Sequence, residues 1–312
     1  MLKILTYIWK NIPCFYFKIQ DCLDTRGKML FIFGSPRSGT TLLSQALNAH
    51  DEIVVPHESD FIIPVAYILD RIKDADIGRD MIYKMIVHSE YYETGRSISE
   101  FLDKDDIKRT VYSTGYNLAM ILDAIYKAMA DKKNKKVGGD KSPNDILGLR
   151  ILVKNNAFSD KSFIVHIVRD IRDVMVSLNK AGWVNDLDLY FPRMWTDSNL
   201  YLYSVFKSQK NRYLLVRYED MVKNPVKIYS NICKMLGVKF QEKMLNPSNR
   251  HPFYKNSPEH KNLFKPITSN RVGIYKSALD HKRIKNYEMQ AQEAIRAFGY
   301  SIKRWSFFNK VK

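Results

Sequence analysis

The stretch Met29–Thr41, MLFIFGSPRSGTT, decides the fold and runs on into the helical pattern LLSQALNAH. Leu30–Phe33 is a short apolar run followed by Gly34 and Pro36, which predicts a buried strand. Apolar residues then recur at helical spacing, so we expect a helix to begin near Gly39. A strand that enters a helix through a glycine-rich turn presents backbone N–H groups at the helix N-terminus. Such a turn predicts a site for a phosphate-like anion.

This loop departs from the Walker A pattern G-x-x-x-x-G-K-[ST]. Gly34 and Gly39 have the required spacing, but Thr40 stands where the lysine belongs, and Thr41 follows it. Arg37 is the loop's cation. The loop is therefore expected to grip an anion through backbone amides and one guanidinium, without the lysine that a nucleotide triphosphatase places on the β- and γ-phosphates.

The composition sets broad limits on function. The chain has 312 residues, 45% of them hydrophobic, which suffices for the core of one domain with or without large insertions. Its net charge of +17 suits a phosphorylated cofactor, an acidic acceptor, nucleic acid or an anionic membrane surface. Abundant lysine alone would also give this charge. Three cysteines without a CxxC pair, and seven histidines without HExxH, indicate neither a disulfide framework nor a zinc site. Reduced cysteines favour a cytoplasmic protein.

Residues 1–28 form an N-terminal aromatic and basic segment. Charged residues and a proline interrupt it, so it is not expected to span a membrane, which takes about 20 mostly apolar residues. A helix packed on the domain surface and a peripheral contact with a membrane both remain open. Residues 29–312 are expected to form one domain, in which residues 240–276, with four prolines and no clear period, resemble a lid.

Strand and helix patterns alternate along residues 29–312. Glu52–Val55, Ser162–Val168 and Tyr213–Val216 read as strands, and Ser162–Val168 is almost continuously apolar, as a strand covered on both faces should be. Helices are expected over 60–73, 79–89, 110–131, 145–156, 171–179, 187–210, 225–236 and 284–298. This alternation predicts an α/β fold with a parallel sheet flanked by helices on both faces, and ligands at the carboxyl ends of the strands.

Three strand ends carry distinctive motifs: FIFGSPRSGTTLL, FIVHIVRDIRDVMVSL and LLVRYEDMVKNP. Together they resemble the sulfotransferases that use 3′-phosphoadenosine 5′-phosphosulfate (PAPS), over about residues 29–237. The resemblance implies a P-loop-NTPase-like fold and release of 3′-phosphoadenosine 5′-phosphate (PAP). It also implies that the 5′ end of PAPS is held by Gly34, Ser35, Arg37, Ser38, Gly39, Thr40 and Thr41.

The second motif implies a site for the 3′-phosphate at Arg169 and Ser177. A guanidinium fork with a hydroxyl donor suits a terminal phosphate, whereas a Walker B strand would end in a magnesium-binding aspartate. Asp170 follows the arginine, either as its partner or as a helix cap. By the same resemblance, Tyr218 lines the adenine pocket or packs in the core, and Arg271 closes over the cofactor.

The chain is most similar to bacterial sulfotransferases and to tyrosylprotein sulfotransferases, which have an arginine at the position of Arg37. Glu58 lies 58 − 37 = 21 positions later, where that subgroup has its catalytic base, and Lys141 matches its sulfuryl-stabilising lysine. His57 is the rival base, since cytosolic sulfotransferases use histidine. Ala181 replaces a further arginine of the tyrosylprotein enzymes, and their luminal membrane anchor is missing. Both differences argue against protein tyrosine as the acceptor.

In-line sulfuryl transfer requires a base for the acceptor proton and cations for the charge that develops. Glu58, Arg37 and Lys141 would fill these roles without a metal. The expected acceptor is a hydroxyl of a carbohydrate, lipid-linked or small molecule. Two alternatives remain: a P-loop kinase with a degenerate Walker A, and a non-catalytic anion- or nucleic-acid-binding protein. Nucleic acid is not expected, because the basic run 132–136 lacks interleaved aromatics. A further aromatic group, in the core or stacked on a sugar, is Trp183, Tyr190, Phe191 and Trp195.

Overall fold

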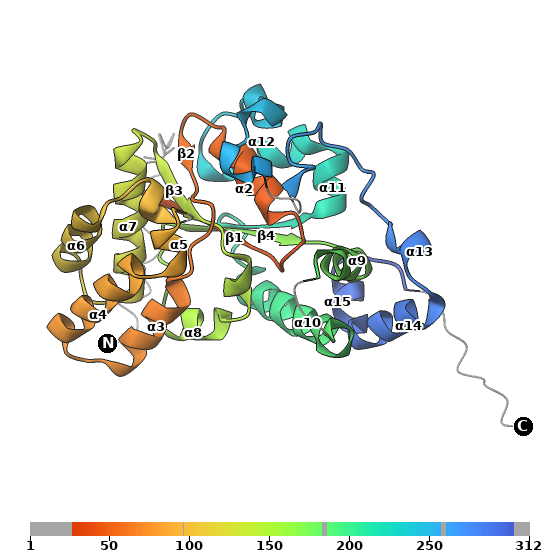
Figure 1. The fold of residues 1–312 in the computed structure, drawn as a ribbon, viewed down its shortest axis with the longest axis horizontal. Helices are drawn as coiled ribbons and strands as arrows, with labels where there is room; N and C mark the ends of the chain where they lie inside the picture. Colours follow the sequence, from red (N-terminus) through yellow and green to blue (C-terminus); the bar gives the residue numbers. More distant parts are fainter. Residues whose placement is uncertain (1–26, 96, 183–185, 257–259, 303–312) are drawn as a thin grey trace, which may run out of the picture.

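A five-stranded parallel sheet forms the centre of the protein (Figure 1). The computed structural model describes residues 27–95, 97–182, 186–256 and 260–302. The strand order is β2–β3–β1–β4–β5. The strands are β1 (Lys28–Phe33), β2 (Ile53–Val54), β3 (Val137–Asp140), β4 (Ser162–Val168) and β5 (Tyr213–Arg217). The sequence prediction of an α/β fold with a parallel sheet is therefore confirmed.

Side chains of β1 alternate between two cores, as successive residues of a strand point to opposite faces. Leu30 and Ile32 pack with α2 (Thr40–Asn48), α11 (Tyr218–Lys223) and α12 (Pro225–Leu236). Met29, Phe31 and Phe33 face the other way. All five side chains are at most 2% exposed, so both faces of the sheet are covered.

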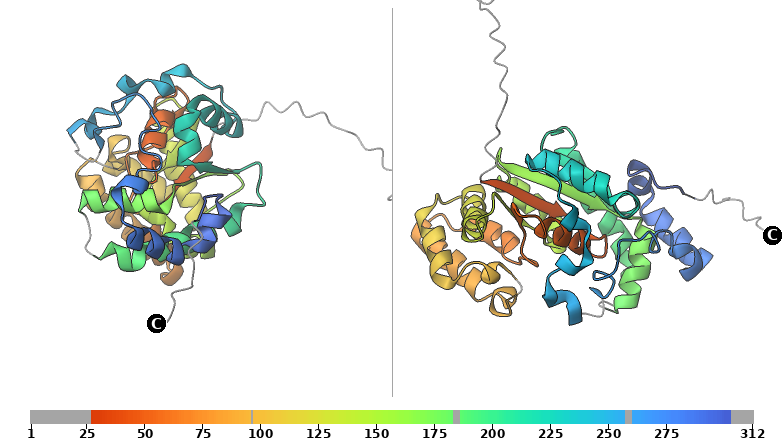
Figure 2. Two further views of the ribbon diagram at one scale, coloured as in Figure 1. Left: turned by 90° about the vertical axis from the view of Figure 1, so that its right-hand side faces the viewer. Right: turned by 90° about the horizontal axis from the view of Figure 1, so that it is seen from above.

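The second face is covered by a larger helical layer. It consists of α3 (Ile62–Arg71), α4 (Ala75–Val87), α5 (Glu90–Glu93), α6 (Lys104–Ser113), α7 (Leu118–Lys132), α8 (Leu149–Lys154) and the C-terminal half of α10 (Leu187–Phe206). Figures 1 and 2 show α4 and α6 at one end of the molecule, with α14 (His281–Gln290) and α15 (Gln292–Ala297) at the other. A third core joins α14 and α15 to α9 (Ile171–Ala181) and α10.

Three helix predictions differ from the structure. The expected helix over 145–156 is the 3₁₀ helix η2 (Pro143–Ile146) followed by α8, which begins after Gly148. The expected helix over 110–131 is two helices, α6 and α7, because the chain leaves the helical conformation at Thr114 and Asn117 caps α7 by accepting from Met120 N. The expected helix over 284–298 is α14 followed by α15, with a break at Ala291.

Residues 240–276 contain the short 3₁₀ helices η3 (Glu242–Leu245), η4 (Pro247–Asn249) and η5 (Pro252–Asn256), followed by α13 (Tyr275–Ala278). The predictions for residues 1–26, including a membrane contact, and for Trp183 lie outside the described residues. Among the described helices, none is long and apolar enough to cross a bilayer.

The carboxyl ends of the five strands meet at one edge of the sheet, because all strands are parallel. The polar residues that the sequence singled out follow these ends directly or, for Glu58, four residues later. They are the loop 34–39 after β1, Glu58 after β2, Lys141 after β3, Arg169 after β4 and Tyr218 after β5.

Candidate active site

The loop between β1 and α2 turns sharply at Arg37 and Gly39, whose φ angles of 67° and 97° lie in the left-handed region. A Cβ on Gly39 would lie 2.6 Å from the ring of Tyr218, and one on Gly34 would lie 2.5 Å from the side chain of Ile167. Gly39 also precedes α2 without a side-chain cap. The first turn of α2 therefore keeps backbone N–H groups available for an anion.

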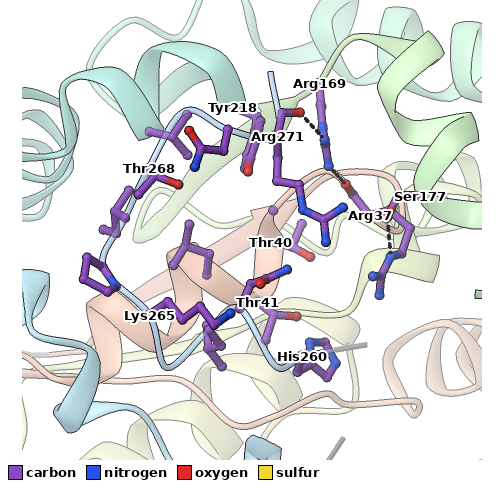
Figure 3. A pocket seen from close by; sticks show the side chains of 18 residues that line it. Arg37, Thr40, Thr41, Arg169, Ser177, Tyr218, His260, Lys265, Thr268 and Arg271 are labelled. Atoms are coloured by element: carbon purple, nitrogen blue, oxygen red, sulfur yellow. Dashed lines mark hydrogen bonds between the residues drawn. The ribbon is translucent and has the colours of Figure 1, made fainter. Parts of the chain in front are cut away.

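Arg169 ties this loop to a distant segment of the chain. Its guanidinium donates to Arg37 O at 3.1 Å and to Arg271 O at 2.7 Å, and it lies 4.4 Å from the centre of the Tyr218 ring. Arg37 Nε donates in turn to Ser177 Oγ at 3.0 Å. Figure 3 shows these side chains around one pocket. The fold thus brings together the residues that the sequence assigned to the two ends of the cofactor.

This pocket, the loop cavity, has a volume of about 490 Å³. Eight predicted residues line it: Arg37, Gly39, Thr40, Thr41, Arg169, Ser177, Tyr218 and, from the lid-like segment, Arg271. Gly34, Ser35 and Ser38 do not line it. Ser35 Oγ accepts from Asn199 Nδ2 at 3.1 Å, and Ser38 is fully buried, so these residues support the loop from behind.

Glu58 and Lys141 form an ion pair beside the loop. Lys141 is completely buried, and its Nζ donates to Glu58 Oε1 at 2.7 Å. The Glu58 side chain is 31% exposed and faces a second cavity. Burying an amine without a counter-charge is costly, and the Glu58 carboxylate offsets this cost at the end of β3.

The second cavity, called here the outer cavity, has a volume of about 560 Å³. Glu58 and His57 line it together with residues of α9, α10 and η5. Four residues line both cavities: Arg37, Thr40, Thr41 and His260. The two cavities therefore meet at the first turn of α2, with a carboxylate on the outer side and arginines on the inner side.

A sequence model described as "Sulfotransferase family" matches residues 30–242, which is more than half of the chain. This chain belongs to the sulfotransferase family. Two solved structures are similar to it in fold. The sulfotransferase domain of the Synechococcus PCC 7002 olefin synthase is 23% identical, with a TM-score of 0.57 over 88% of this chain and 95% of that one. The sulfotransferase domain from the curacin biosynthetic pathway is 19% identical, with a TM-score of 0.59 over 88% and 99%. A search of curated proteins found no match.

Asp170, beside Arg169 of this sulfotransferase, is a helix cap. Its carboxylate accepts from Arg172 N at 3.0 Å and from the Arg172 guanidinium, which also contacts Glu288. Of the two readings of Asp170, the cap is thus correct, and its ionic partner is Arg172. His166 is a hydrogen-bonded core residue, with Tyr213 and Asn199 as partners. Burial lowers the pKa of His166 to about 4.

His57, the rival base, is packed within an aromatic cluster. It is 3% exposed, and its ring stacks on Phe253 with centroids 4.5 Å apart. His57 Nε2 lies 3.5 Å from Glu100, and the other oxygen of Glu100 lies 3.1 Å from His251 Nε2. Burial, followed by the charges of His251 and Lys141, lowers the pKa of His57 to about 3.

His57, Glu100 and His251 also form a group of potential metal ligands, which the sequence motifs did not indicate. His251 Nδ1, however, accepts from Phe253 N at 3.2 Å. A neutral His251 therefore carries its proton on Nε2 and donates it to Glu100. A metal-bound histidine instead donates through the nitrogen that does not bind the metal. The arrangement suits a hydrogen-bonded contact that joins the three segments around His57, Glu100 and His251.

Sequence reasoning missed several residues of the loop cavity. Lys265 and Thr268 line it from the lid-like segment (Figure 3). Asn270 lines it as well, and His260 lines both cavities. These residues follow no motif. Their only signal was the unusual length of the segment without a regular period. Of the aromatic group, Tyr190 and Phe191 line the outer cavity, whereas Trp195 is 1% exposed in the third core.

Proposed function

We propose that this sulfotransferase moves the sulfuryl group of PAPS to an acceptor hydroxyl, and that the two cavities hold the nucleotide and the acceptor. The observation that carries the proposal is their shared boundary, formed by Arg37, Thr40, Thr41 and His260. Donor and acceptor must approach in line for direct transfer. Two cavities that meet at one anion-binding turn meet this requirement.

The residues of the loop cavity fit a nucleotide that carries anions at both ends. Arg37, Arg169, Arg271 and Lys265 supply positive charge, and the Tyr218 ring offers an aromatic face. Arg169 Nε is buried and has no hydrogen-bond partner within the described residues. A phosphate oxygen would satisfy this donor. PAPS supplies an activated sulfuryl group on a phosphate leaving group.

Glu58 is the base that we assign to the reaction. It borders the outer cavity and is 31% exposed, so an acceptor hydroxyl can reach it. The S–O bond to the phosphate breaks, the S–O bond to the acceptor forms, and the acceptor proton passes to Glu58. Arg37, which lines both cavities, offsets negative charge on the transferring group, and Lys141, which lines neither cavity, adds its charge from behind Glu58. His57 is a poor rival, since its ring is packed against Phe253 and its lowered pKa makes it a weak base.

Thermal unfolding in the presence of PAP, ATP with magnesium, GTP or a short oligonucleotide tests the proposal. A ligand that binds only the folded state raises the unfolding temperature by mass action. PAP is expected to stabilise the protein most, and Arg37→Ala should abolish sulfuryl transfer with little change in the unfolding temperature without ligand. A shift with ATP and magnesium but none with PAP would refute the proposal and favour a kinase. If the wild type binds PAP but transfers no sulfuryl group, the result would favour a non-catalytic binding protein.

A further inference from the structure

The outer cavity has one polar end and a largely apolar body. Its charged and strongly polar side chains are Arg37, Thr40, Thr41 and His260 at the boundary with the loop cavity, together with His57 and Glu58, whereas the body carries Asn144 and the hydroxyls of three tyrosines. Its volume of about 560 Å³ falls in the range of about 300–1,000 Å³ of cavities that hold drug-sized molecules. A molecule bound here would place one polar group at the boundary and the rest of its surface against the walls.

One wall is a single face of α10. Leu187, Tyr190, Phe191 and Met194 recur at positions i, i+3, i+4 and i+7, which lie on one side of a helix. Leu178 of α9 extends this wall. Neither helix brings a charged side chain to the cavity. The wall therefore offers hydrocarbon and aromatic surface.

The rest of the lining beyond the boundary is also rich in apolar surface. Leu147, Phe253, Tyr254 and Tyr91 line this part. Three lining residues are large hydrophobics that remain open to solvent: Leu147 at 47%, Tyr190 at 42% and Phe253 at 38%. Apolar side chains that surround a cavity mouth mark a binding surface more often than isolated exposed ones do. An apolar ligand would cover this surface.

Polar groups for a sugar are scarce beyond the boundary. Among the lining residues these groups are the Asn144 amide and the hydroxyls of Tyr91, Tyr190 and Tyr254, of which Tyr254 Oη already donates to His57 O at 3.4 Å, and no carboxylate or guanidinium lines the body of the cavity. A carbohydrate carries a hydroxyl on most of its carbons, and each hydroxyl buried without a partner costs free energy. The walls thus disfavour a polyhydroxylated acceptor.

From these walls we infer that the acceptor is a hydroxyl on an apolar body, an alkyl chain or an aromatic ring system, and not a free sugar. The inference rests on the proposed function. The apolar body of the acceptor fills the cavity beside α10, and its hydroxyl lies at the boundary within reach of Glu58. Release of the acceptor's surface from water supplies the binding energy.

Sulfuryl transfer from PAPS to a series of primary alcohols, from butanol to decanol, tests this inference, with glucose and N-acetylglucosamine as comparison acceptors. Burying one methylene is worth roughly 0.8 kcal/mol, so kcat/KM should rise about fourfold per carbon until the cavity is full. Sulfuryl transfer to the sugars should be far slower than transfer to octanol. PAP-induced stabilisation is measured in parallel. If PAP binds while the alcohol series is flat, inactive or slower than the sugars, the inference alone is wrong. If PAP does not bind and nothing is transferred, the proposed function fails as well.

Two neighbouring residues of α10 provide a matched pair of variants. Tyr190 lines the cavity and Leu189, 74% exposed, does not, and both are open enough to accept a charge without unfolding the helix. Tyr190→Glu should lower kcat/KM for octanol at least tenfold and leave the dissociation constant of PAP unchanged. Leu189→Glu should behave as the wild type. Equal effects of the two variants, or no effect of Tyr190→Glu, would contradict the inference.

Discussion

At the scale of single residues, Glu58 decides whether the site can deprotonate an acceptor. Replacing it with glutamine keeps a hydrogen-bond acceptor for Lys141 Nζ but removes the base. Glu58→Gln should therefore lower kcat by about 10²–10⁴-fold, the usual contribution of a general base, with little change in the dissociation constant of PAP. Single-turnover kinetics and calorimetric titration measure the two effects. His57→Ala is the comparison, and a larger loss of kcat in that variant would transfer the role of base to His57.

The buried histidine His57 should make the protein sensitive to acid. Its pKa in the folded protein is about 3, against about 6.5 in an unfolded chain, because burial disfavours the imidazolium. Between these values the unfolded chain binds a proton that the folded protein does not. The free energy of unfolding therefore falls as the pH drops from 6.5 towards 3, by up to about 1.4 kcal/mol per pH unit.

Urea unfolding at pH 7.5, 6.0 and 5.0 measures this slope, and His57→Gln should reduce it. The slope should not vanish, since burial lowers the pKa of His166 to about 4 and gives a second contribution of the same sign. Equal slopes in the variant and the wild type would mean that His57 becomes protonated in the folded protein.

At the scale of elements, the lid-like segment is held by α9. Asp173 accepts hydrogen bonds from Gly273 N at 2.7 Å and from Tyr275 N at 2.9 Å. In the chain these residues follow Arg271, whose carbonyl oxygen accepts from Arg169. Asp173→Ala should free this end of the segment. We expect a roughly tenfold weaker affinity for PAP, faster proteolysis within 260–273, and a kcat near that of the wild type once PAPS is saturating.

Asp280→Ala is the matched control for this effect. Asp280 also accepts a backbone hydrogen bond, from Arg283 N at 2.8 Å, but it caps α14 and holds no part of 260–273. Its loss should cost about 1 kcal/mol of stability, as for other N-caps, without changing the affinity for PAP. If both variants bind PAP equally weakly, general destabilisation explains the result, and the anchor on α9 does not.

The elements also show how far the sequence leads. Ser162–Val168 was predicted to the residue, because a doubly covered strand is continuously apolar. The single helix expected over 110–131 was wrong, because α6 ends before Thr114 and a local cap at Asn117 starts α7. The apolar residues of the two helices continue the same helical spacing, so the sequence pattern did not reveal the break. The proximity of residues that follow strand ends could be predicted from the sequence, because parallel strands end at one edge of the sheet. Lys265 and His260 could not, because only tertiary packing carries their segment to the loop.

At the scale of the whole molecule, the net charge of +17 leaves two explanations for anion binding. Either the summed field of the protein attracts any polyanion, or a few cations around the loop cavity bind one ligand. Salt separates the two, since charges more than about 8 Å apart in solvent are largely screened at physiological ionic strength. The comparison needs one lysine inside the cavity and one far from it.

Lys265 lines the loop cavity, whereas Lys104 begins α6 at the opposite end of the molecule from α14 (Figure 1). Both variants, Lys265→Gln and Lys104→Gln, lower the net charge by one. With calorimetry at 50, 150 and 500 mM salt, Lys265→Gln should weaken PAP binding several-fold at 150 mM, by an amount that shrinks at 500 mM. Lys104→Gln should follow the wild type at 150 mM and above. Matching losses at 150 mM would mean that total charge, and not the arrangement around the loop, holds the ligand. The basic composition would then be the main determinant of binding.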